Sequence, residues 1–346
     1  MEQKKSGGGR IRFYAQVRGV FWLSVVILLT TGASCRFFQP RMFSQSRFLL
    51  DTVIDITVVS RSPKEATAAI DAAYAEIKRI EALLSKYVPE SQVSAINRQA
   101  GESETTQVDA EVTVIVQRAL DYTERTSGMF NMAIGAIIDL WGIGTEHEGV
   151  PDTGELSQSL QLIDPRDVTI EGQTVHLTQA GMLIDLGGIA KGYGIDQALA
   201  IIQAHGIQHV LVNAGGDIRS TGAKPDGTPW RIGIQHPREN GLLGVVELRD
   251  AAITTSGDYE RFFVHDDVRY HHLFDPRTGM PARGCQSVTI LTNTAEAADV
   301  YSTAVFIMGP EQGLAFVEDH AELEGMIVRA DGSIATSSGF TYMPVE

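Results

Sequence analysis

Two side chains near the C-terminus have the types and the spacing of a cation site. Asp299 and Thr303 are four residues apart in the apolar segment 295–308, so a helix would place both oxygens on one face. A carboxylate and a hydroxyl, joined by a nearby backbone carbonyl, form an oxygen-only site that suits magnesium better than zinc. A surface acid next to a core hydroxyl has the same spacing, so the pattern alone leaves both interpretations open.

Two adjacent histidines are candidates for a general base. His271 and His272 fall at successive positions of the predicted strand 268–274, so their side chains face opposite ways and only one can enter a given site. An imidazole with a pKa near neutrality is a suitable proton acceptor for a hydroxyl nucleophile. Two half-exposed strand residues would show the same pattern. Ser256 lacks a surrounding Gly-x-Ser-x-Gly pattern, which argues against a serine hydrolase.

The glycine-rich stretch 182–222 is the element that we expect to position a ligand. Its apolar runs 182–186 and 210–212 predict short strands, and the apolar spacing that starts at Ile195 predicts a helix. The glycines before this helix, which include Gly188, predict a loop whose backbone amides can approach an anion closely.

A carboxylate and an ammonium group belong to the same glycine segment. Asp185 precedes the first glycines and Lys191 follows them, so the segment could hold a phosphate and a metal. Ordinary tight turns in the core of an α/β protein contain similar glycines, and this alternative stays open on the glycines alone.

The rest of the chain mixes helices and strands without a repeat or a low-complexity linker. Ser62, Pro63 and Glu65 form a capping box with proline at the first helical position, which predicts the start of a long helix. We therefore predict one continuous α+β unit. Strands are predicted at 48–60, 230–236, 244–249, 262–264, 268–274, 287–292 and in a closing hairpin at 326–336, and helices at 62–84, 91–99, 109–126, 295–308 and after Pro310.

Charge and cysteine content restrict the possible partners. The formal net charge of −15 over 346 residues makes nucleic acid and anionic membrane surfaces poor partners. An anionic ligand must then be held locally, by backbone amides, by a cation or by single basic residues. The two cysteines, Cys35 and Cys285, indicate neither a disulfide framework nor a zinc site.

The N-terminus has the layout of an export signal. Five Lys and Arg residues precede the apolar run 20–31, and the small residues Gly32, Ala33 and Ser34 precede Cys35. We expect residues 1–35 to be a lipoprotein signal with Cys35 lipidated, followed by a linker at 36–47. An uncleaved membrane anchor and an ordinary cleaved signal are the alternatives, because the apolar run is short for a stable span. All three predict a body exported across the cytoplasmic membrane and facing the periplasm.

Taken together, these segments resemble the ApbE family of FAD:protein FMN transferases. The resemblance covers roughly residues 48 to 345 and is carried, in chain order, by SKYVPESQVSAIN, GMFNMAIGAIIDLWGIG, IDLGGIAKGYGIDQ, LVNAGGDIRSTG, TSGDYERFF, HHLFDPRTGMP and ADVYSTAVFIMG. It implies an α+β fold of two intimate lobes with FAD in the cleft between them. It also implies a Mg²⁺-dependent reaction that links FMN from FAD to a Thr or Ser hydroxyl of a target protein and releases AMP. Membrane-bound redox subunits and exported flavin-carrying domains are the targets that it implies.

The resemblance also implies roles for individual residues. The metal would be held by Asp299, Thr303 and the main-chain carbonyl of Gly188, and His272 would be the general base. Contacts with FAD are implied for Leu50, Tyr87, Met129, Phe130, Asn131, Asp185, Lys191 and Phe274. The family's Met-Gly-Thr on the first strand reads Leu50-Asp51-Thr52 in this chain, so the contact at Leu50 departs from the pattern.

Two other functions fit the same motifs. A Mg²⁺-dependent FAD pyrophosphatase would use water in place of the acceptor hydroxyl and give FMN and AMP. An exported FAD-binding lipoprotein would need the ligand site but neither Asp299 nor His272 for chemistry. Release of AMP, and the ratio of free FMN to protein-bound flavin, separate the three.

Overall fold

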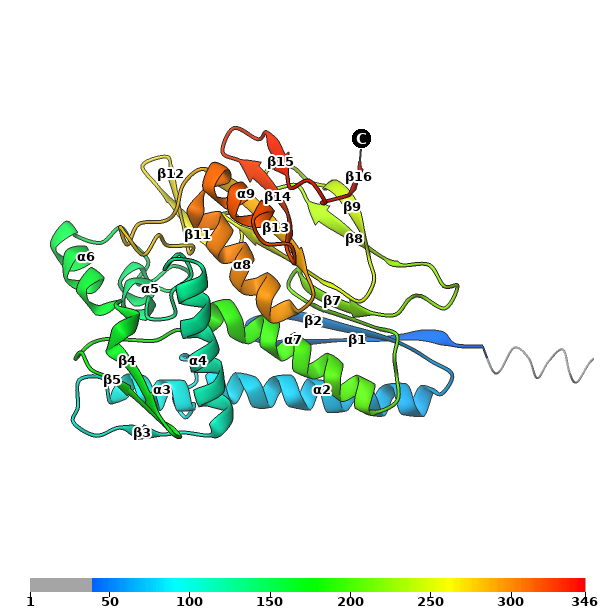
Figure 1. Ribbon diagram of the computed structural model, residues 1–346, viewed down its shortest axis with the longest axis horizontal. Coiled ribbons are helices and arrows are strands. Elements are labelled where there is room, and N and C mark those ends of the chain that lie inside the picture. The colour runs from blue at the N-terminus through cyan, green and yellow to red at the C-terminus, as the bar shows by residue number, and fades with distance from the viewer. Residues whose placement is uncertain (1–38, 346) are drawn as a thin grey trace, which may run out of the picture.

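One large sheet forms the centre of the computed structural model, which describes residues 39–345 (Figure 1). It has eight strands, each antiparallel to its neighbours, in the order β1-β2-β6-β7-β10-β13-β14-β15. Its strands are β1 (Arg41–Leu49), β2 (Thr52–Ser60), β6 (Val210–Ala214), β7 (Asp217–Thr221), β10 (Ala252–Gly257), β13 (Cys285–Thr292), β14 (Glu324–Arg329) and β15 (Ile334–Thr336).

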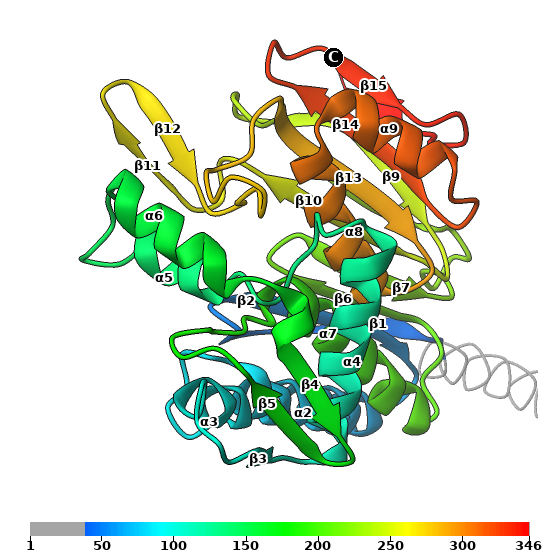
Figure 2. The same cartoon turned by 60° about the vertical axis from the view of Figure 1, so that its left-hand side comes forward.

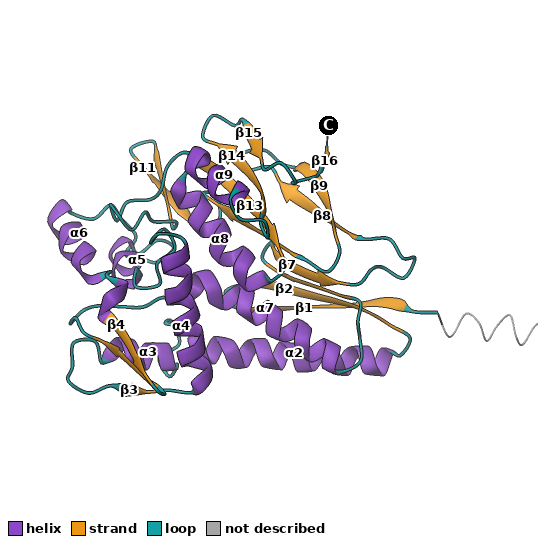
Figure 3. Ribbon diagram, in the orientation of Figure 1, coloured by secondary structure: helices purple, strands orange, loops and turns teal. Residues whose placement is uncertain are grey.

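Helices cover one face of this sheet and a small second sheet covers part of the other, as Figure 3 shows. The helices are α2 (Pro63–Leu84), α7 (Gly187–Ala204), α8 (Ala295–Met308) and α9 (Pro310–Glu318), and the small sheet consists of β8 (Trp230–Gln235), β9 (Leu242–Leu248) and β16 (Met343–Pro344). Alternate residues of β2 explain the arrangement: Ile54, Ile56 and Val58 pack against α2 and α7, whereas Val59 packs with the small sheet.

A second lobe packs against α7 and α8 (Figure 2). It contains α3 (Gln92–Arg98), α4 (Ala110–Arg125), α5 (Gly135–Trp141), α6 (Thr153–Ser159), β3 (Thr106–Gln107), β4 (Val168–Glu171), β5 (Thr174–Leu177) and 3₁₀ turns at Leu160–Leu162 and Pro165–Asp167. Its apolar core includes Tyr193 of α7 and Val300 of α8, so the two lobes share one core. The predicted α+β fold of two intimate lobes is confirmed.

Strands β11 (Phe262–His265) and β12 (Val268–His271) form a hairpin that is a separate two-stranded sheet. Its Phe263 and Tyr270 rings stack at 5.3 Å, and Tyr270 also lies 5.4 Å from the ring of Trp141 in α5. A hairpin of two strands is marginal by itself, so these aromatic contacts support the strand that leads to His272.

Several predicted elements are confirmed with their caps. Ser62 accepts a hydrogen bond from the Glu65 amide at the start of α2, and Ser91 accepts one from Ser94 at the start of α3. The predicted helix 295–308 is α8, with Thr294 as its N-cap. Within the described residues, no helix has the length and apolar character to cross a bilayer.

The N-terminal expectations meet the structure only in part. The signal segment 1–35 lies outside the described residues, as does the start of the linker 36–47. Strand β1 occupies most of that linker, because the chain reverses at Leu50 and Asp51, whose φ angles of 52° and 57° form a tight turn into β2. The prediction of a single strand over 48–60 was therefore wrong. Sequence patterns do not predict a turn at a leucine, because leucine rarely adopts a positive φ.

Helix α7 begins at Gly187, eight residues before the predicted start at Ile195. The expected glycine loop is thus the first two turns of a helix, despite the low helix propensity of glycine. The reason is tertiary: a Cβ at Gly192 would lie 2.3 Å from the carbonyl oxygen of Ala295, so only glycine lets α7 approach α8 this closely. The predicted strand 182–186 is reduced to one isolated bridge between Leu183 and Ile134.

Candidate active site

The close approach of α7 and α8 brings the C-terminal carboxylate to the glycine segment. The Gly192 amide donates a hydrogen bond of 2.9 Å to Oδ2 of Asp299, which is 5% exposed. Gly192 lies about one helical turn after Gly188. The two sequence motifs that the cation hypothesis requires to meet therefore lie side by side.

A lysine and two buried carboxylates form the electrostatic centre of this site. Nζ of Lys191 lies 2.6 Å from Oδ2 of Asp217, which is 2% exposed, and the charge of Asp299 also acts on Lys191. Burial, followed by the charge of Asp217, raises the pKa of Asp299 to about 7. The single ammonium of Lys191 thus lies near two buried carboxylates, Asp217 and Asp299, and cannot neutralise both of their negative charges. Sequence reasoning missed Asp217, although it follows the glycine pair Gly215-Gly216 that marks a tight turn.

Hydroxyl groups surround the second predicted metal ligand. Thr303 is half-buried one turn after Asp299, and its Oγ1 lies 3.4 Å from Oγ of Ser256. Ser256 Oγ also lies 2.9 Å from Oγ of Ser302. In the described part of the chain, no three His, Cys, Asp or Glu side chains are grouped as metal ligands. The oxygen-bearing side chains of this region are therefore the carboxylates of Asp217 and Asp299 and the hydroxyls of Ser256, Ser302 and Thr303.

Asp185 and Phe130 flank the start of α7. Oδ1 of Asp185 accepts a 2.6 Å hydrogen bond from the Gly187 amide, and the Asp185 amide donates to the Met132 carbonyl at 2.7 Å. The buried Phe130 ring covers Gly188, where an added Cβ would lie 3.1 Å from Cε2. The predicted ligand segments 129–131 and 185–191 are therefore neighbours in the fold.

The other implied FAD contacts differ in how open they are. Tyr87 is exposed in the loop after α2, and Met129 is partly buried against the core. The side-chain amide of Asn131 is hydrogen-bonded within the protein. Its Nδ2 donates to the Ile163 carbonyl and its Oδ1 accepts from the Ala133 amide, both at 2.9 Å. Leu50 is half-buried in the β1–β2 turn, and its amide donates to Oε1 of Glu81 at 2.8 Å.

The ring of Phe274 belongs to a small apolar core. It is buried and lies 5.6 Å from the ring of Trp141, whose Nε1 donates to the Gly279 carbonyl at 2.8 Å. These contacts hold the turn that follows the two histidines. Packing therefore occupies the Phe274 ring, and a ligand would meet its backbone.

The two histidines contact different parts of the protein, but β12 ends at His271, so the predicted strand 268–274 was too long and His272 lies just beyond it. His271 is buried, with Nε2 2.9 Å from the Ala282 carbonyl, whereas His272 is half-buried with Nδ1 3.2 Å from the Arg261 carbonyl. Because a carbonyl only accepts, Nδ1 of His272 donates the proton and Nε2 keeps its lone pair. Burial and then the charge of Arg261 lower the pKa of His272 to about 3, so its ring is neutral at pH 7, and the near-neutral pKa expected from the sequence was wrong for this histidine. The charge of Lys191 contributes as well, which puts both groups in one electrostatic environment.

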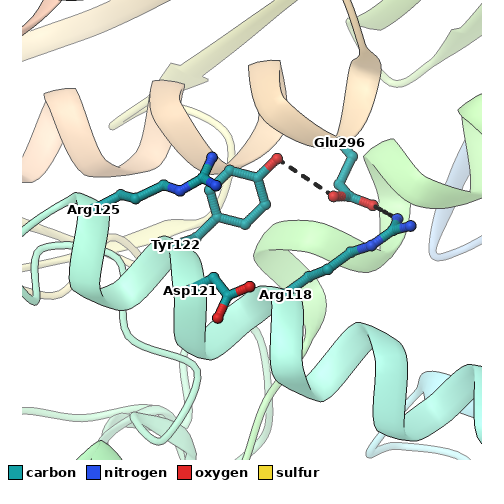
Figure 4. A pocket seen from close by; sticks show the side chains of 5 residues that line it. All are labelled: Arg118, Asp121, Tyr122, Arg125 and Glu296. Carbon is teal, nitrogen blue, oxygen red and sulfur yellow. Dashed lines mark hydrogen bonds and ion pairs between the residues drawn. The ribbon is translucent and has the colours of Figure 1, made fainter.

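A surface pocket lies behind this site, between α4 and α8 (Figure 4). Arg118 pairs with Glu296 at 2.9 Å, and the Tyr122 hydroxyl donates to the same carboxylate at 3.3 Å. Asp121 and Arg125 complete the lining. These bonds fasten the first turn of α8, three residues before Asp299, to the smaller lobe.

Comparisons with known proteins identify relatives of this chain along most of its length. A sequence profile of the ApbE family matches residues 50–327. The chain is 34% identical to the FAD:protein FMN transferase of Treponema pallidum over 342 residues, covering 92% of this chain and 94% of that protein. It is 33% identical to the Vibrio cholerae FAD:protein FMN transferase over 273 residues, covering 78% of this chain and 81% of that protein.

Solved structures show the same fold. The ApbE protein of Thermotoga maritima superposes with a TM-score of 0.81 at 35% identity, covering 86% of this chain and 97% of that one. The flavin transferase ApbE of Vibrio cholerae superposes with a TM-score of 0.77 at 30% identity, covering 87% and 98%. On its sequence, its fold and the meeting of its motifs at one site, this chain belongs to the ApbE family.

Proposed function

We propose that this protein is a flavin transferase that moves FMN from FAD to a Thr or Ser hydroxyl of an acceptor protein and releases AMP. The relatives described above carry the name FAD:protein FMN transferase, and they match most of this chain. The observation that carries the proposal is the contact of Asp299 with Gly192 of α7, together with the charge interactions of Lys191 with Asp299 and with His272.

The site's charge supports Mg²⁺ as the metal. The raised pKa of Asp299 indicates a buried carboxylate whose charge Lys191 does not fully offset, and the donors around it are oxygens. Asp299, Thr303 and the carbonyl of Gly188 would hold the ion. When bound, Mg²⁺ would supply charge neutralisation for the diphosphate and for the AMP leaving group.

The chain's own residues would position both substrates. The positive end of the α7 helix dipole and the ammonium of Lys191 would offset the negative charge of the FAD diphosphate. Nε2 of His272, unprotonated at neutral pH, would accept the proton of the acceptor hydroxyl as its oxygen attacks phosphorus. The acceptor oxygen–phosphorus bond forms as the bond from phosphorus to the oxygen of AMP breaks.

Covalent flavin on a purified acceptor tests the metal ligand. We expect Asp299→Ala to lose covalent flavin loading, because the carboxylate that binds the metal is gone. Loading is read from flavin fluorescence of the acceptor after denaturing electrophoresis. Normal loading by this variant would refute the metal assignment.

His272→Ala tests the base. We expect it to lose transfer and to keep FAD binding, because the ring acts on the acceptor hydroxyl and not on the flavin. Loss of FAD binding in this variant would instead give His272 a structural role.

The products of the wild-type protein separate the two alternative functions. Release of free FMN and AMP without flavin labelling of the acceptor would identify a pyrophosphatase. No release of AMP with Mg²⁺ present would identify a binding protein.

We also propose that the protein is exported and held at the cytoplasmic membrane, facing the periplasm. The basic, apolar and small-residue layout of residues 1–35 supports this, and Cys35 is the proposed lipid attachment site. The mass of the mature N-terminal peptide tests it: a diacylglyceryl-modified Cys35 is the expected result, and an intact residue 1 would indicate an uncleaved anchor.

A further inference from the structure

A buried lysine that the proposed reaction does not use lies behind the ligand segments. The side chain of Lys86, just after the end of α2, is only 4% exposed. Its Nζ contacts Oδ1 of Asp139 on α5 and lies 3.5 Å from Oδ2 of Asp185, before α7. Lys86 therefore joins three segments that come from different parts of the chain.

The two carboxylates differ in their need for this ammonium. The Asp139 side chain is 53% exposed, so water can solvate it, whereas that of Asp185 is 11% exposed. A buried charge without a partner is costly, and burial alone would lower the pKa of Lys86. The charge of Asp185 is the largest opposing cause, and with Asp139 it keeps the pKa of Lys86 raised. Lys86 thus stays cationic, with Asp139 as its closer partner and Asp185 as its more buried one.

The two carboxylate oxygens of Asp185 have different partners. Oδ1 accepts from the Gly187 amide at 2.6 Å, so Oδ2 is the oxygen directed at Lys86. The Asp185 amide is held by the Met132 carbonyl. The same ammonium lies 5.0 Å from the ring centroid of Tyr87, which is exposed. One cation therefore lies next to both the Asp185 carboxylate and the Tyr87 ring.

We propose that Lys86 is a positioning residue for FAD, which orients Asp185 and the Tyr87 ring toward the ligand without touching the reacting atoms. The inference rests on the proposed function, because it takes FAD as the ligand of these two residues. Removal of the ammonium would leave Oδ2 of Asp185 without its nearby cation, while Oδ1 stays bonded to the Gly187 amide, and would leave the Tyr87 ring without its cation. FAD affinity would fall, whereas the chemical step at saturating FAD would change little.

Two substitutions at position 86 and one matched control test the proposal. We expect Lys86→Met to raise the Kd for FAD about tenfold or more, measured by flavin fluorescence titration, with kcat at saturating FAD within about threefold of wild type. Lys86→Arg should restore most of the affinity because it restores the cation. Lys78→Met, which removes an exposed lysine of α2, should leave the Kd unchanged.

A double-mutant cycle shows whether Lys86 acts through Asp185. We expect Asp185→Asn to weaken FAD binding, and Lys86→Met to add little when it is combined with Asp185→Asn. Asp139→Asn should bind FAD like wild type, because the pairing with Asp185 remains. Wild-type affinity of Lys86→Met, or additive losses in the cycle, would overturn the inference. If Lys86→Met does not fold, unchanged FAD affinity of Asp185→Asn would overturn it.

The outcome for wild type separates this inference from the proposed function. Wild-type protein that binds FAD but labels no acceptor would contradict the transferase and leave the role of Lys86 supported by the affinity data. Wild-type protein that does not bind FAD would contradict both. Normal labelling together with normal affinity of Lys86→Met would contradict only the inference.

Discussion

At the scale of single residues, folding and metal binding make opposite demands on Asp299. Its pKa is raised to about 7 in the fold, first by burial, compared with about 3.9 in an unfolded chain. Between these pH values the native state binds more protons than the unfolded state. The free energy of unfolding of the metal-free protein therefore falls as the pH rises from about 4 to about 7, and then levels off.

Asp299→Asn should consequently stabilise the metal-free protein while it abolishes transfer. At pH 8 with a chelator, we expect the free energy of unfolding to rise by on the order of 1–3 kcal/mol, because no charge is buried. The gain should shrink toward pH 4, where the wild-type carboxyl is protonated. Urea unfolding at pH 5 and pH 8 measures the gain in stability at each pH, and Asp319→Asn, which changes an exposed carboxylate, is the control. A variant less stable than wild type at pH 8 would contradict the charge argument.

The free energy of unfolding also depends on the ion pair of Lys191 with Asp217. Lys191→Met leaves the carboxylate of Asp217 buried without its 2.6 Å partner, so we expect a loss of about 3–5 kcal/mol in the free energy of unfolding. Asp217→Asn in the same chain should recover part of it, because the unpaired charge is removed. Denaturant unfolding of the two single variants and the double variant tests this. Equal loss in the Lys191 single and the double variant would show that packing, not charge, is responsible.

At the scale of elements, the contact of α7 with α8 decides whether the site exists. Asp196 of α7 reinforces it by accepting from the Ala295 and Glu296 amides at 2.9 and 3.1 Å. A side chain on one helix thus binds the free amides at the start of the other. These bonds set the position of α8, and with it that of Asp299.

Gly192→Ala should separate these helices. Its Cβ would lie 2.3 Å from the Ala295 carbonyl oxygen, so α8 must shift and the bond from Gly192 to Asp299 is strained. We expect a loss of about 1–3 kcal/mol in stability, together with weaker metal binding. Thermal unfolding and metal titration measure these effects. Gly149→Ala, where a Cβ meets nothing within 4 Å, is the control, and an equal effect there would refute the close-contact explanation.

At the scale of the whole molecule, a net charge of −15 makes the site depend on local cations. Mg²⁺ that binds only the folded state should raise the melting temperature, by an amount equivalent to about 1.4 kcal/mol at ten times its Kd. The shift should be larger at pH 8 than at pH 5, because protons compete for Asp299 below pH 7. NaCl at matched ionic strength should not reproduce it. A shift that persists in Asp299→Asn would assign the effect to another site.

The sequence by itself determined most of the helices and strands and the types of chemical group that they carry. The cap at Ser62, the apolar segment 295–308 and the first part of the predicted strand 268–274 depend on neighbours along the chain, so local rules predict them. The pairing of Asp299 with Thr303 follows from helix geometry. The motifs also carried the resemblance to the family.

Only the tertiary structure decided which of these groups meet. The early start of α7 at Gly187 depends on its fit against Ala295, about a hundred residues later, and no local propensity encodes such a contact. The pairings of Asp217 with Lys191 and of Lys86 with Asp185 join segments far apart in the chain. Burial and charge, which set the pKa values of the site, exist only once the chain is folded.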